Sequence, residues 1–311
     1  MLFLAQAAFL LRNSIGRKRR LVMIQFAGYH SFLPCLWARI FGWKSVIVAG
    51  GTDCVAFPSL KYGNFQNPLL ALFTRLSYRL CHTVSAVHEC LFFREDHYGN
   101  SSESRQGILQ FIPEARFRKN VIFNGFNSRI FRIEQAWESR AEHSFLSISA
   151  DLTDPVRMRL KGTDMVLKLA EQMPGARFTL VGCRQNPDFP VPSNVQLLPP
   201  VPNEQLPEIC NQHRFYLQLS LSEGFPNALC EAMACGCIPI VSEVASMPFI
   251  TEETGGIAGK RNISSILNAV KEAEEKARIP GHSERISEGI KQRFSWEKRQ
   301  TQLLKLIEET A

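Results

Sequence analysis

The stretch FYLQLSLSEGFPNALCEAMACGCIPIVSE, residues 215–243, carries the pattern on which the fold assignment rests. Residues 215–220 have a strand pattern, residues 226–236 have the length and composition of a helix, and residues 237–243 return to a strand pattern. Pro226 stands where the first helical residue is expected, because its missing N–H costs nothing there. Strand, helix and strand in immediate succession predict a β-α-β unit with parallel strands.

The same alternation extends over most of the chain. The second half contains further predicted elements at residues 144–150, 162–174, 176–183, 194–200 and 203–212. The first half contains predicted elements at residues 21–28, 31–42, 44–51, 67–81, 82–88 and 120–126. Strands that alternate with helices of about 10 to 15 residues predict parallel, doubly wound sheets. The polar interval RIEQAWESRAEHS, residues 132–144, separates the two series, so we expect an α/β protein of two facing Rossmann-like domains with a boundary near Glu138.

Composition and charge narrow the class of protein. The chain has 311 residues, of which 45% are hydrophobic and 21% charged, as in an ordinary globular protein of about two domains. Residues 1–138 contain 17 Lys and Arg against 8 Asp and Glu, whereas residues 139–311 contain 19 against 21. A basic first half favours anionic partners such as phosphates or acidic lipids. Nucleic acid is not expected, because the sequence has no zinc-finger, RNP or helix-turn-helix pattern.

The N-terminal stretch and the cysteines bear on the compartment. No window reaches the 18 or more apolar residues of a membrane-spanning helix, and the apolar residues 1–11 precede a basic run, which reverses the order of a signal peptide. Nine cysteines, an odd number, indicate reduced thiols. We therefore predict a cytoplasmic protein. The run Arg17 to Arg20 beside residues 1–11 either contacts anionic lipid headgroups or forms an exposed turn before a strand.

The helix start at Pro226 predicts an anion site. Its N–H groups lack intrahelical partners and lie at the positive end of the helix dipole, which suits a diphosphate. The predicted donors are the N–H groups of Gly224, Phe225, Asn227 and Ala228. Glu223 in the turn can accept bonds from sugar hydroxyls, and Glu231, about two turns along, can reach a ribose diol.

These residues resemble a known family. The frame EGFPNALCEAMACGCIPIVS, residues 223–242, is similar to the donor-site signature of family 4 glycosyltransferases (group 1 glycosyltransferases) with the GT-B fold. Further similar segments are KGTDMVLKLAEQMP at 161–174, NVQLLPPVPNEQLPEI at 194–209, VIFNGFNSRIF at 121–131 and AGGTDCVAFPSLKYGNF at 49–65. The resemblance runs from Leu21 to the C-terminus, and the family's first strand with its glycine-rich loop has no counterpart. It implies a shortened acceptor-side domain over 1–138, a nucleotide-sugar-binding domain over 139–292 and a helix over 293–311 that packs back toward the first domain.

The resemblance also implies roles for single residues. Glu223 lies against the transferred sugar, Glu231 binds the nucleotide ribose, and Lys161 neutralises the donor diphosphate as it leaves. The family often has an arginine five residues before that lysine, where this chain has Val156, so Arg157 or Arg159 is the candidate replacement. Such enzymes retain anomeric configuration and use no metal and no cofactor besides the nucleotide-sugar substrate, because cations and the helix end stabilise the leaving group.

On the acceptor side the family has a His-Gly pair where this chain reads Gly50 to Asp53. The acceptor-side candidates are Gly51, Thr52, Asp53, His30 and His88, each with the alternative of a structural role. The remaining cluster of reactive side chains, Cys230, Cys235 and Cys237, is expected to pack in the core rather than bind metal.

Two classes of function follow. The first is a retaining, metal-independent glycosyltransferase that moves a sugar from a UDP- or GDP-linked donor to a glycan or lipid-linked acceptor, in the cytoplasm and peripherally at the inner face of the membrane. The second is a catalytically inactive or partner-dependent nucleotide-sugar-binding subunit, which would bind nucleotide without transferring sugar. A sugar-nucleotide epimerase or a phosphorylase on the same fold is a third, weaker reading, and the sequence shows no pyridoxal-phosphate lysine context for a phosphorylase.

Overall fold

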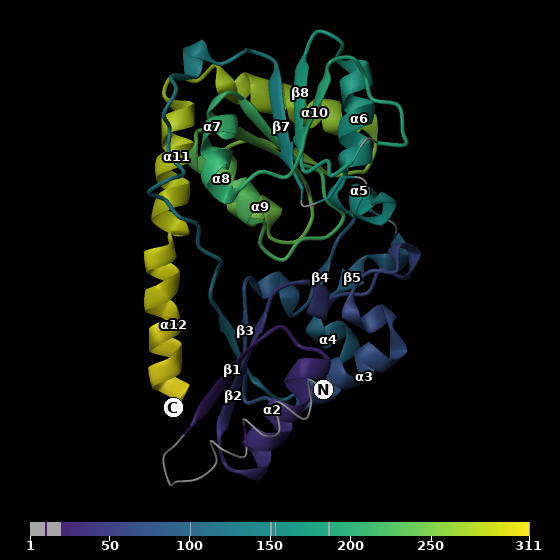
Figure 1. The fold of residues 1–311 in the computed structure, drawn as a ribbon, viewed down its shortest axis with the longest axis vertical. Coiled ribbons are helices and arrows are strands. Elements are labelled where there is room, and N and C mark those ends of the chain that lie inside the picture. The colour runs from purple at the N-terminus through teal and green to yellow at the C-terminus, as the bar shows by residue number, and fades with distance from the viewer. Residues whose placement is uncertain are drawn as a thin grey trace. The chain divides into compact units, whose positions relative to one another are not determined.

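The computed structural model describes residue 10 and residues 20–99, 101–149, 151–152, 154–185 and 187–310. The chain divides into two compact units (Figure 1). Unit 1 comprises Met1–Glu95, Ser102–Asn124 and Arg299–Ala311, and unit 2 comprises Asp96–Ser101 and Gly125–Lys298. The N-terminal apolar stretch other than Leu10, and the basic residues 17–19, lie outside the described residues.

Unit 1 is built on a parallel sheet with the strand order β1-β2-β3-β6. Its strands are β1 (Leu21–Gln25), β2 (Lys44–Ala49), β3 (Thr83–Ala86) and β6 (Arg118–Val121). Its helices are α2 (Tyr29–Ile40), α3 (Pro68–Leu80), α4 (Ile108–Phe111) and most of α12 (Trp296–Thr310), and a small antiparallel pair joins β4 (Arg94–Glu95) to β5 (Arg105–Gln106). The helices α2 and α3 pack side by side, since each follows one strand of the sheet and precedes the next.

The register of this sheet decides which side chains α12 covers. Met23 pairs with Val46, so these two side chains point to the same face. Val46, Ile122 and Leu306 form a buried apolar cluster against which Leu303 packs. Because Leu303 and Leu306 lie on α12, the last helix of the chain completes the core of unit 1.

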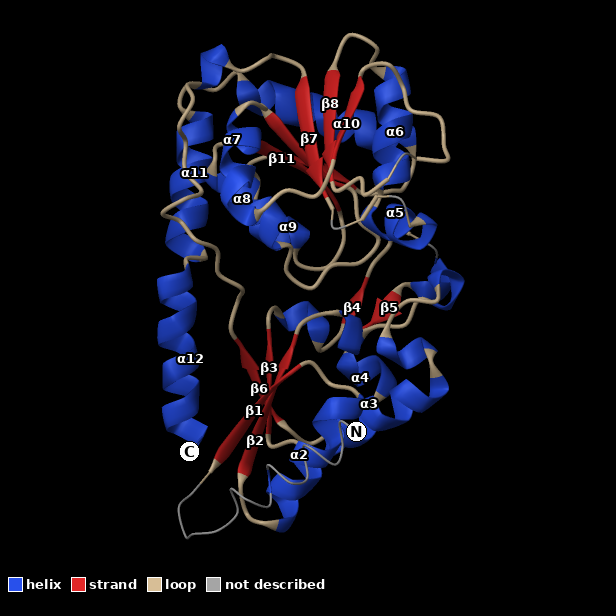
Figure 2. Ribbon diagram, in the orientation of Figure 1, coloured by secondary structure: helices blue, strands red, loops and turns tan. Residues whose placement is uncertain are grey.

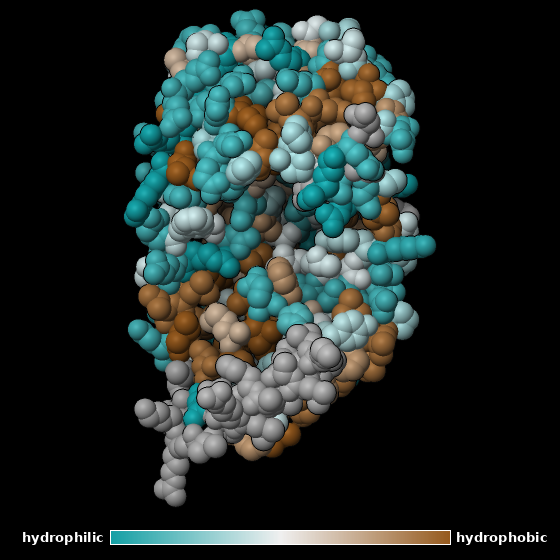
Figure 3. Space-filling model, in the orientation of Figure 1, coloured by the Kyte–Doolittle hydropathy of each residue, from teal (hydrophilic) through white to brown (hydrophobic). Residues whose placement is uncertain are grey.

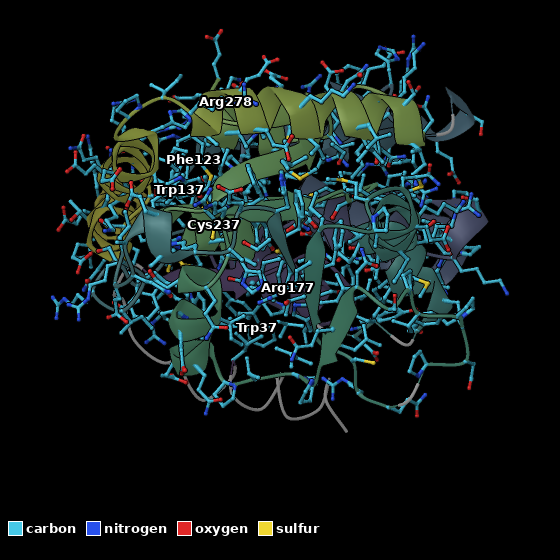
Figure 4. All side chains as sticks on the ribbon, turned by 90° about the horizontal axis from the view of Figure 1, so that it is seen from above. Trp37, Phe123, Trp137, Arg177, Cys237 and Arg278 are labelled. Atoms are coloured by element: carbon cyan, nitrogen blue, oxygen red, sulfur yellow. The ribbon has the colours of Figure 1, made fainter. Side chains whose placement is uncertain are left out.

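Unit 2 is built on a larger parallel sheet with the order β12-β11-β10-β7-β8-β9. Its strands are β7 (Ser144–Ile148), β8 (Arg177–Val181), β9 (Val195–Leu198), β10 (Phe215–Gln218), β11 (Ile238–Ser242) and β12 (Gly256–Ala258). Its helices are α5 (Pro155–Lys161), α6 (Thr163–Gln172), α7 (Leu206–Asn211), α8 (Asn227–Ala234), α9 (Met247–Thr251), α10 (Ile263–Ala277) and α11 (His282–Arg293). Helix α10 packs beside α6, and α8 packs beside α7 and α11, so helices cover the sheet (Figure 2). Figure 4 shows α10 lying across this sheet, with Arg278 directly after its end.

Three phenylalanines hold the middle of this sheet together. The register places Phe145 of β7 opposite Phe178 of β8 and Phe215 of β10. The ring of Phe145 is stacked on Phe178 with centroids 4.9 Å apart and on Phe215 with centroids 5.1 Å apart. All three are buried, so the ladder joins three neighbouring strands through apolar area and ring contacts.

The predicted α/β architecture with two parallel-sheet domains is confirmed. Among the described residues, no helix is long and apolar enough to cross a bilayer. The cysteines at 230, 235 and 237 are buried in the core and none is in a disulfide. The structure adds elements that the sequence reading did not define, among them α4, α5, α9, α10, α11, β12 and the β4–β5 pair.

The division between the units differs from the sequence prediction. The predicted boundary follows residue 138, whereas the structure assigns residues 125–298 to unit 2 and residues 299–311 to unit 1. The polar composition of residues 132–144 predicts a separation of the two series there, but polar groups of this interval are bound by unit 2. Asn211 Oδ1 accepts the N–H of Glu134 at 2.8 Å, and the buried Arg140 donates to Gln135 O at 2.9 Å and Cys235 O at 2.9 Å.

We predict that Arg140→Ala destabilises unit 2. The side chain is 2% exposed and also donates to His213 O and Asn211 Oδ1, so its loss leaves several buried acceptors unpaired. We expect a loss of roughly 2–4 kcal/mol in the free energy of unfolding, measured by urea denaturation. Arg132→Ala, which removes an exposed guanidinium paired with Glu134, should change it by less than about 0.5 kcal/mol. Equal stability of the two variants would contradict the role given to Arg140.

Candidate active site

The site in unit 2 depends on the close approach of two turns. Gly162 ends α5 and begins α6, with φ +74°. A Cβ added there would lie 2.0 Å from the carbonyl oxygen of Leu219, which follows β10. The N–H of Leu221 donates to Leu160 O at 2.8 Å beside this contact. Only glycine allows both the backbone angle and the contact, so the turn after α5 is fixed against the loop after β10.

This contact brings together two charged residues that are 62 positions apart. Lys161 Nζ donates to Glu223 Oε1 at 2.7 Å. Ser220 Oγ donates to the same oxygen at 2.8 Å, and Gln218 Nε2 does so at 3.0 Å. Glu223 is 9% exposed, so three donors, one of them the ammonium of Lys161, compensate the loss of hydration of its carboxylate.

A buried polar chain behind Glu223 fixes its donors. Tyr216 OH donates to Gln218 Oε1 at 2.9 Å, and Gln218 Nε2 reaches both Ser220 Oγ and Glu223 Oε1. Sequence reasoning missed these residues. A signal was present, because Tyr216, Gln218 and Ser220 alternate with leucines and therefore point to one side of an otherwise apolar strand.

Helix α5 places one arginine beside the lysine. Arg157 and Lys161 are four residues apart in α5, so they share a face of the helix, whereas Arg159 is turned away from it. The side chain of Asp154 caps the helix by accepting the N–H of Arg157 at 2.7 Å. The sequence left Arg157 and Arg159 as alternatives, and the helical geometry favours Arg157.

The turn at residues 223–226 leads into α8. The helix begins at Asn227, one residue later than predicted, and Pro226 is its N-cap residue. The N–H groups of its first turn, including those of Asn227 and Ala228, have no intrahelical partner by geometry. Phe225 is 6% exposed, and its ring meets that of Phe294 edge to face at a centroid distance of 5.0 Å. Phe225 therefore holds the turn in place by packing, while the backbone N–H groups of the turn are the hydrogen-bond donors.

Glu231 lies inside α8 and is also buried. Asn203 Nδ2 donates to its Oε1 at 3.4 Å, a long hydrogen bond. Burial raises the pKa of Glu231, and the bond from Asn203 opposes this in part. Among the described residues no salt bridge compensates this charge as Lys161 does for Glu223, so the ionised form of Glu231 costs folding free energy and suits a ligand that donates hydrogen bonds.

Unit 1 has a pocket of about 270 Å³ at the carboxyl ends of β1 and β2. It is lined in part by Gly28 at the start of α2, and by His30, Thr52 and Asn64. His30 Nε2 is 2.9 Å from Gln25 O, and Thr52 Oγ1 is 3.0 Å from Tyr62 OH. Thr52 and His30, both acceptor-side candidates, thus share one pocket.

Asp53 also lines this pocket. It is 1% exposed, and its Oδ2 accepts Tyr78 OH at 2.7 Å and the N–H of Ala27 at 3.0 Å. Its Oδ1 accepts the N–H groups of Gly50 and Gly51 at 3.2 and 3.1 Å. These four N–H and O–H donors hold the two strand-end loops together, and the contact of Asp53 with an acceptor stays a prediction.

His88 lies after β3, apart from the residues lining that pocket. It is buried, and its Nδ1 accepts the N–H of Cys90 at 3.2 Å. Burial lowers its pKa, and Arg94 adds to this while Glu89 opposes it. A neutral ring whose Nδ1 accepts carries its proton on Nε2. This hydrogen bond gives His88 a structural role at the turn after β3.

Comparisons with known proteins agree with this geometry. Residues 156–275 match the family model "Glycosyl transferases group 1". The fold resembles that of sucrose-phosphate synthase from Thermosynechococcus elongatus (TM-score 0.67, 16% identity, 93% of this chain and 73% of that one). It also resembles HepE from Anabaena in complex with UDP-glucose (TM-score 0.67, 14% identity, 97% and 81%). A third match is the pneumococcal O-GlcNAc transferase GtfA in complex with UDP and GlcNAc (TM-score 0.64, 15% identity, 97% and 59%). A sequence comparison with curated proteins gives no match.

The two parallel sheets and these similarities define the GT-B fold of glycosyltransferases. The matched region holds Lys161, Glu223 and Glu231 and forms most of unit 2. The protein thus has the fold of GT-B glycosyltransferases, and residues 156–275 match the group 1 glycosyltransferase family, as the sequence motif predicts. The chain spans 59% of the length of GtfA and 73% of that of the synthase.

We predict that Glu231→Gln stabilises the protein without ligand at pH 7. The pKa of Glu231 is raised in the folded state, so the protonated side chain contributes to the free energy of unfolding below the unfolded pKa of about 4.5. This contribution is lost as the pH rises through the folded pKa. The neutral amide avoids this loss, so its advantage in Tm should shrink as pH falls toward 4.5. Glu208→Gln, on the exposed side of α7, is the control and should leave Tm unchanged. A lower Tm for Glu231→Gln at pH 7 would contradict the prediction.

Proposed function

We propose that the protein is a retaining, metal-independent glycosyltransferase that takes a sugar from a UDP- or GDP-linked donor. The observation that carries this proposal is the ion pair between Lys161 and Glu223, at 2.7 Å, directly before the start of α8. It combines a carboxylate for sugar hydroxyls with a cation and a helix N-terminus for a diphosphate. The complexes of HepE with UDP-glucose and of GtfA with UDP and GlcNAc make UDP-sugars the first donors to test.

In the proposed reaction, the bond between the sugar's anomeric carbon and the diphosphate oxygen breaks, and an acceptor hydroxyl forms the new bond on the same face of the sugar. The acceptor's proton passes to the departing diphosphate. Lys161 and Arg157 stabilise the charge that develops on that diphosphate, which is the role of a divalent cation in other transferases. An ammonium group has three N–H donors, so Lys161 can bind Glu223 and a phosphate oxygen together.

Two further parts of the proposal concern the nucleotide and the acceptor. Glu231 accepts hydrogen bonds from the ribose diol, a role supported by its buried, weakly bonded carboxylate. The acceptor is a glycan or a lipid-linked molecule bound by unit 1, and the pocket with His30 and Thr52 is the candidate for it. We place the reaction in the cytoplasm, peripherally at the inner face of a membrane.

Glu223→Gln should abolish sugar transfer while the protein still binds nucleotide. The variant keeps the shape of the side chain but loses the charge that faces Lys161, and we expect turnover to fall by about 100-fold or more. Donor hydrolysis and transfer are measured on the full chain, and UDP and GDP binding by thermal shift. Unchanged turnover would remove Glu223 from the site. Nucleotide binding without any transfer by the wild-type chain would instead support a non-catalytic nucleotide-sugar-binding subunit.

Arg157→Ala and Arg159→Ala form a matched pair on one helix. Both side chains are exposed, so neither change should affect stability by more than about 0.5 kcal/mol. Because Arg157 shares a face with Lys161, its loss should weaken UDP binding by about tenfold, whereas Arg159→Ala should leave the Kd unchanged. Titration calorimetry measures both. A larger effect of Arg159→Ala would reverse the assignment.

A further inference from the structure

The surface charge of unit 1 is unusually one-sided. The first 88 residues contain ten Lys and Arg but one carboxylate, Asp53. That carboxylate is 1% exposed and accepts hydrogen bonds from N–H and O–H donors of unit 1, so it does not contribute to the surface charge of α2 and α3. Neither α2 nor α3 contains an acidic residue. A partner that binds the outer faces of these helices therefore faces their cations, and it faces no carboxylate of α2 or α3.

Large apolar side chains stand among these cations at the end of α2. Ile40 is 65% exposed and Phe41 is 48% exposed. The ring of Phe41 is stacked on that of Trp37, with centroids 4.5 Å apart. Two residues further on, the Trp43 ring lies 5.3 Å from the guanidinium carbon of Arg20. Exposed aliphatic and aromatic side chains beside cations are the composition typical of protein surfaces that lie at the boundary between lipid headgroups and acyl chains.

Helix α3 adds a second apolar stripe. Leu69 is 57% exposed and Leu72 is 48% exposed, and the helical period places Leu76 on the same face. Rings of Tyr29 and Phe73, 5.3 Å apart, join α2 to α3.

At the other end of the two helices, Arg39 Nε donates to Leu80 O at 2.7 Å, so their C-terminal ends are adjacent. The two exposed stripes therefore belong to one pair of packed helices. Figure 3 shows brown, apolar surface in the region of α3.

We infer that this pair of helices docks onto a bilayer that contains anionic phospholipids. The docking surface is defined by Trp37, Ile40, Phe41, Leu69 and Leu72, with Arg39 and Lys44 as its exposed cations. Arg79 is not one of these cations, because its guanidinium is paired with the carboxylate of Glu114.

The charge argument favours lipid over a protein partner. Exposed leucines and a stacked Trp-Phe pair supply apolar area, and the cations of two helices that contain no acidic residue of their own match an anionic plane. The inference rests on the membrane partner in the proposed function and assigns it to residues other than the basic run that ends at Arg20.

The test is co-sedimentation of the full chain with vesicles. Vesicles of phosphatidylcholine with 30% phosphatidylglycerol (about one lipid in three) are compared with pure phosphatidylcholine vesicles, because an anionic surface attracts each basic residue near it. The variant Ile40→Glu with Phe41→Glu, and separately Leu69→Glu with Leu72→Glu, should lower the partition coefficient on anionic vesicles by about tenfold. The matched control is Leu304→Glu with Ile307→Glu, since both side chains are exposed apolar residues of α12, 52% and 37% exposed. The control should bind as the wild-type chain does.

The outcomes separate the inference from the proposed function. Circular dichroism melting and the UDP thermal shift are measured on every variant, and both should equal those of the wild-type chain. Equal vesicle binding by the first two variants and the wild type would overturn the docking surface. Concentration-dependent self-association that is lost in those variants, without vesicle binding, would assign the face to a second copy and also overturn it. Vesicle binding without any nucleotide thermal shift would leave the inference standing and count against the proposed transfer reaction.

Discussion

The contact of Gly162 with the carbonyl oxygen of Leu219 is the constraint on which the donor site depends. It fixes the end of α5 against the loop after β10, and so it sets the distance between the ammonium of Lys161 and the carboxylate of Glu223. A side chain at this position would clash and would also be strained at φ +74°. The strand β10 is in turn held by the stacked ring of Phe215, so the position of the charges follows from the packing of the sheet.

Three buried carboxylates show how differently a fold can compensate the same charge. Glu223 has a cation and side-chain donors, Asp53 has three backbone N–H groups and a tyrosine, and Glu231 has one long hydrogen bond. The first two arrangements satisfy the carboxylate within the protein. The third arrangement leaves the pKa of Glu231 raised, so its ionised carboxylate lowers the stability of the folded protein. The hydroxyl groups of a ligand can supply the hydrogen-bond donors that this carboxylate lacks. Glu223 and Glu231 belong to the matched glycosyltransferase region, and Asp53 belongs to the framework of unit 1.

The two units also differ in how charge is distributed. Residues 1–138 carry a surplus of cations, and residues 139–311 have 19 Lys and Arg against 21 Asp and Glu. In unit 2 the important cation, Lys161, is local and paired. In unit 1 the cations stand beside exposed Ile40 and Phe41 on helices without acidic residues. Local pairing suits recognition of a small anionic group, whereas a broad cationic and apolar face suits an extended anionic surface.

The sequence by itself determined the alternation of strands and helices and the parallel sheets, because hydrophobic period and turn chemistry are local properties. For the same reason it placed Glu223 in a turn and Glu231 inside the helix that follows. It also indicated Lys161, through a family resemblance. Only the tertiary structure paired Lys161 with Glu223, placed Arg157 on the face of α5 that holds Lys161, and buried the carboxylate of Asp53 among hydrogen-bond donors. The boundary after residue 124 likewise required knowledge of what Arg140 binds. These features depend on contacts between residues far apart in the chain, and a pattern of neighbouring residues does not encode which distant groups the packing of a sheet brings within a hydrogen bond.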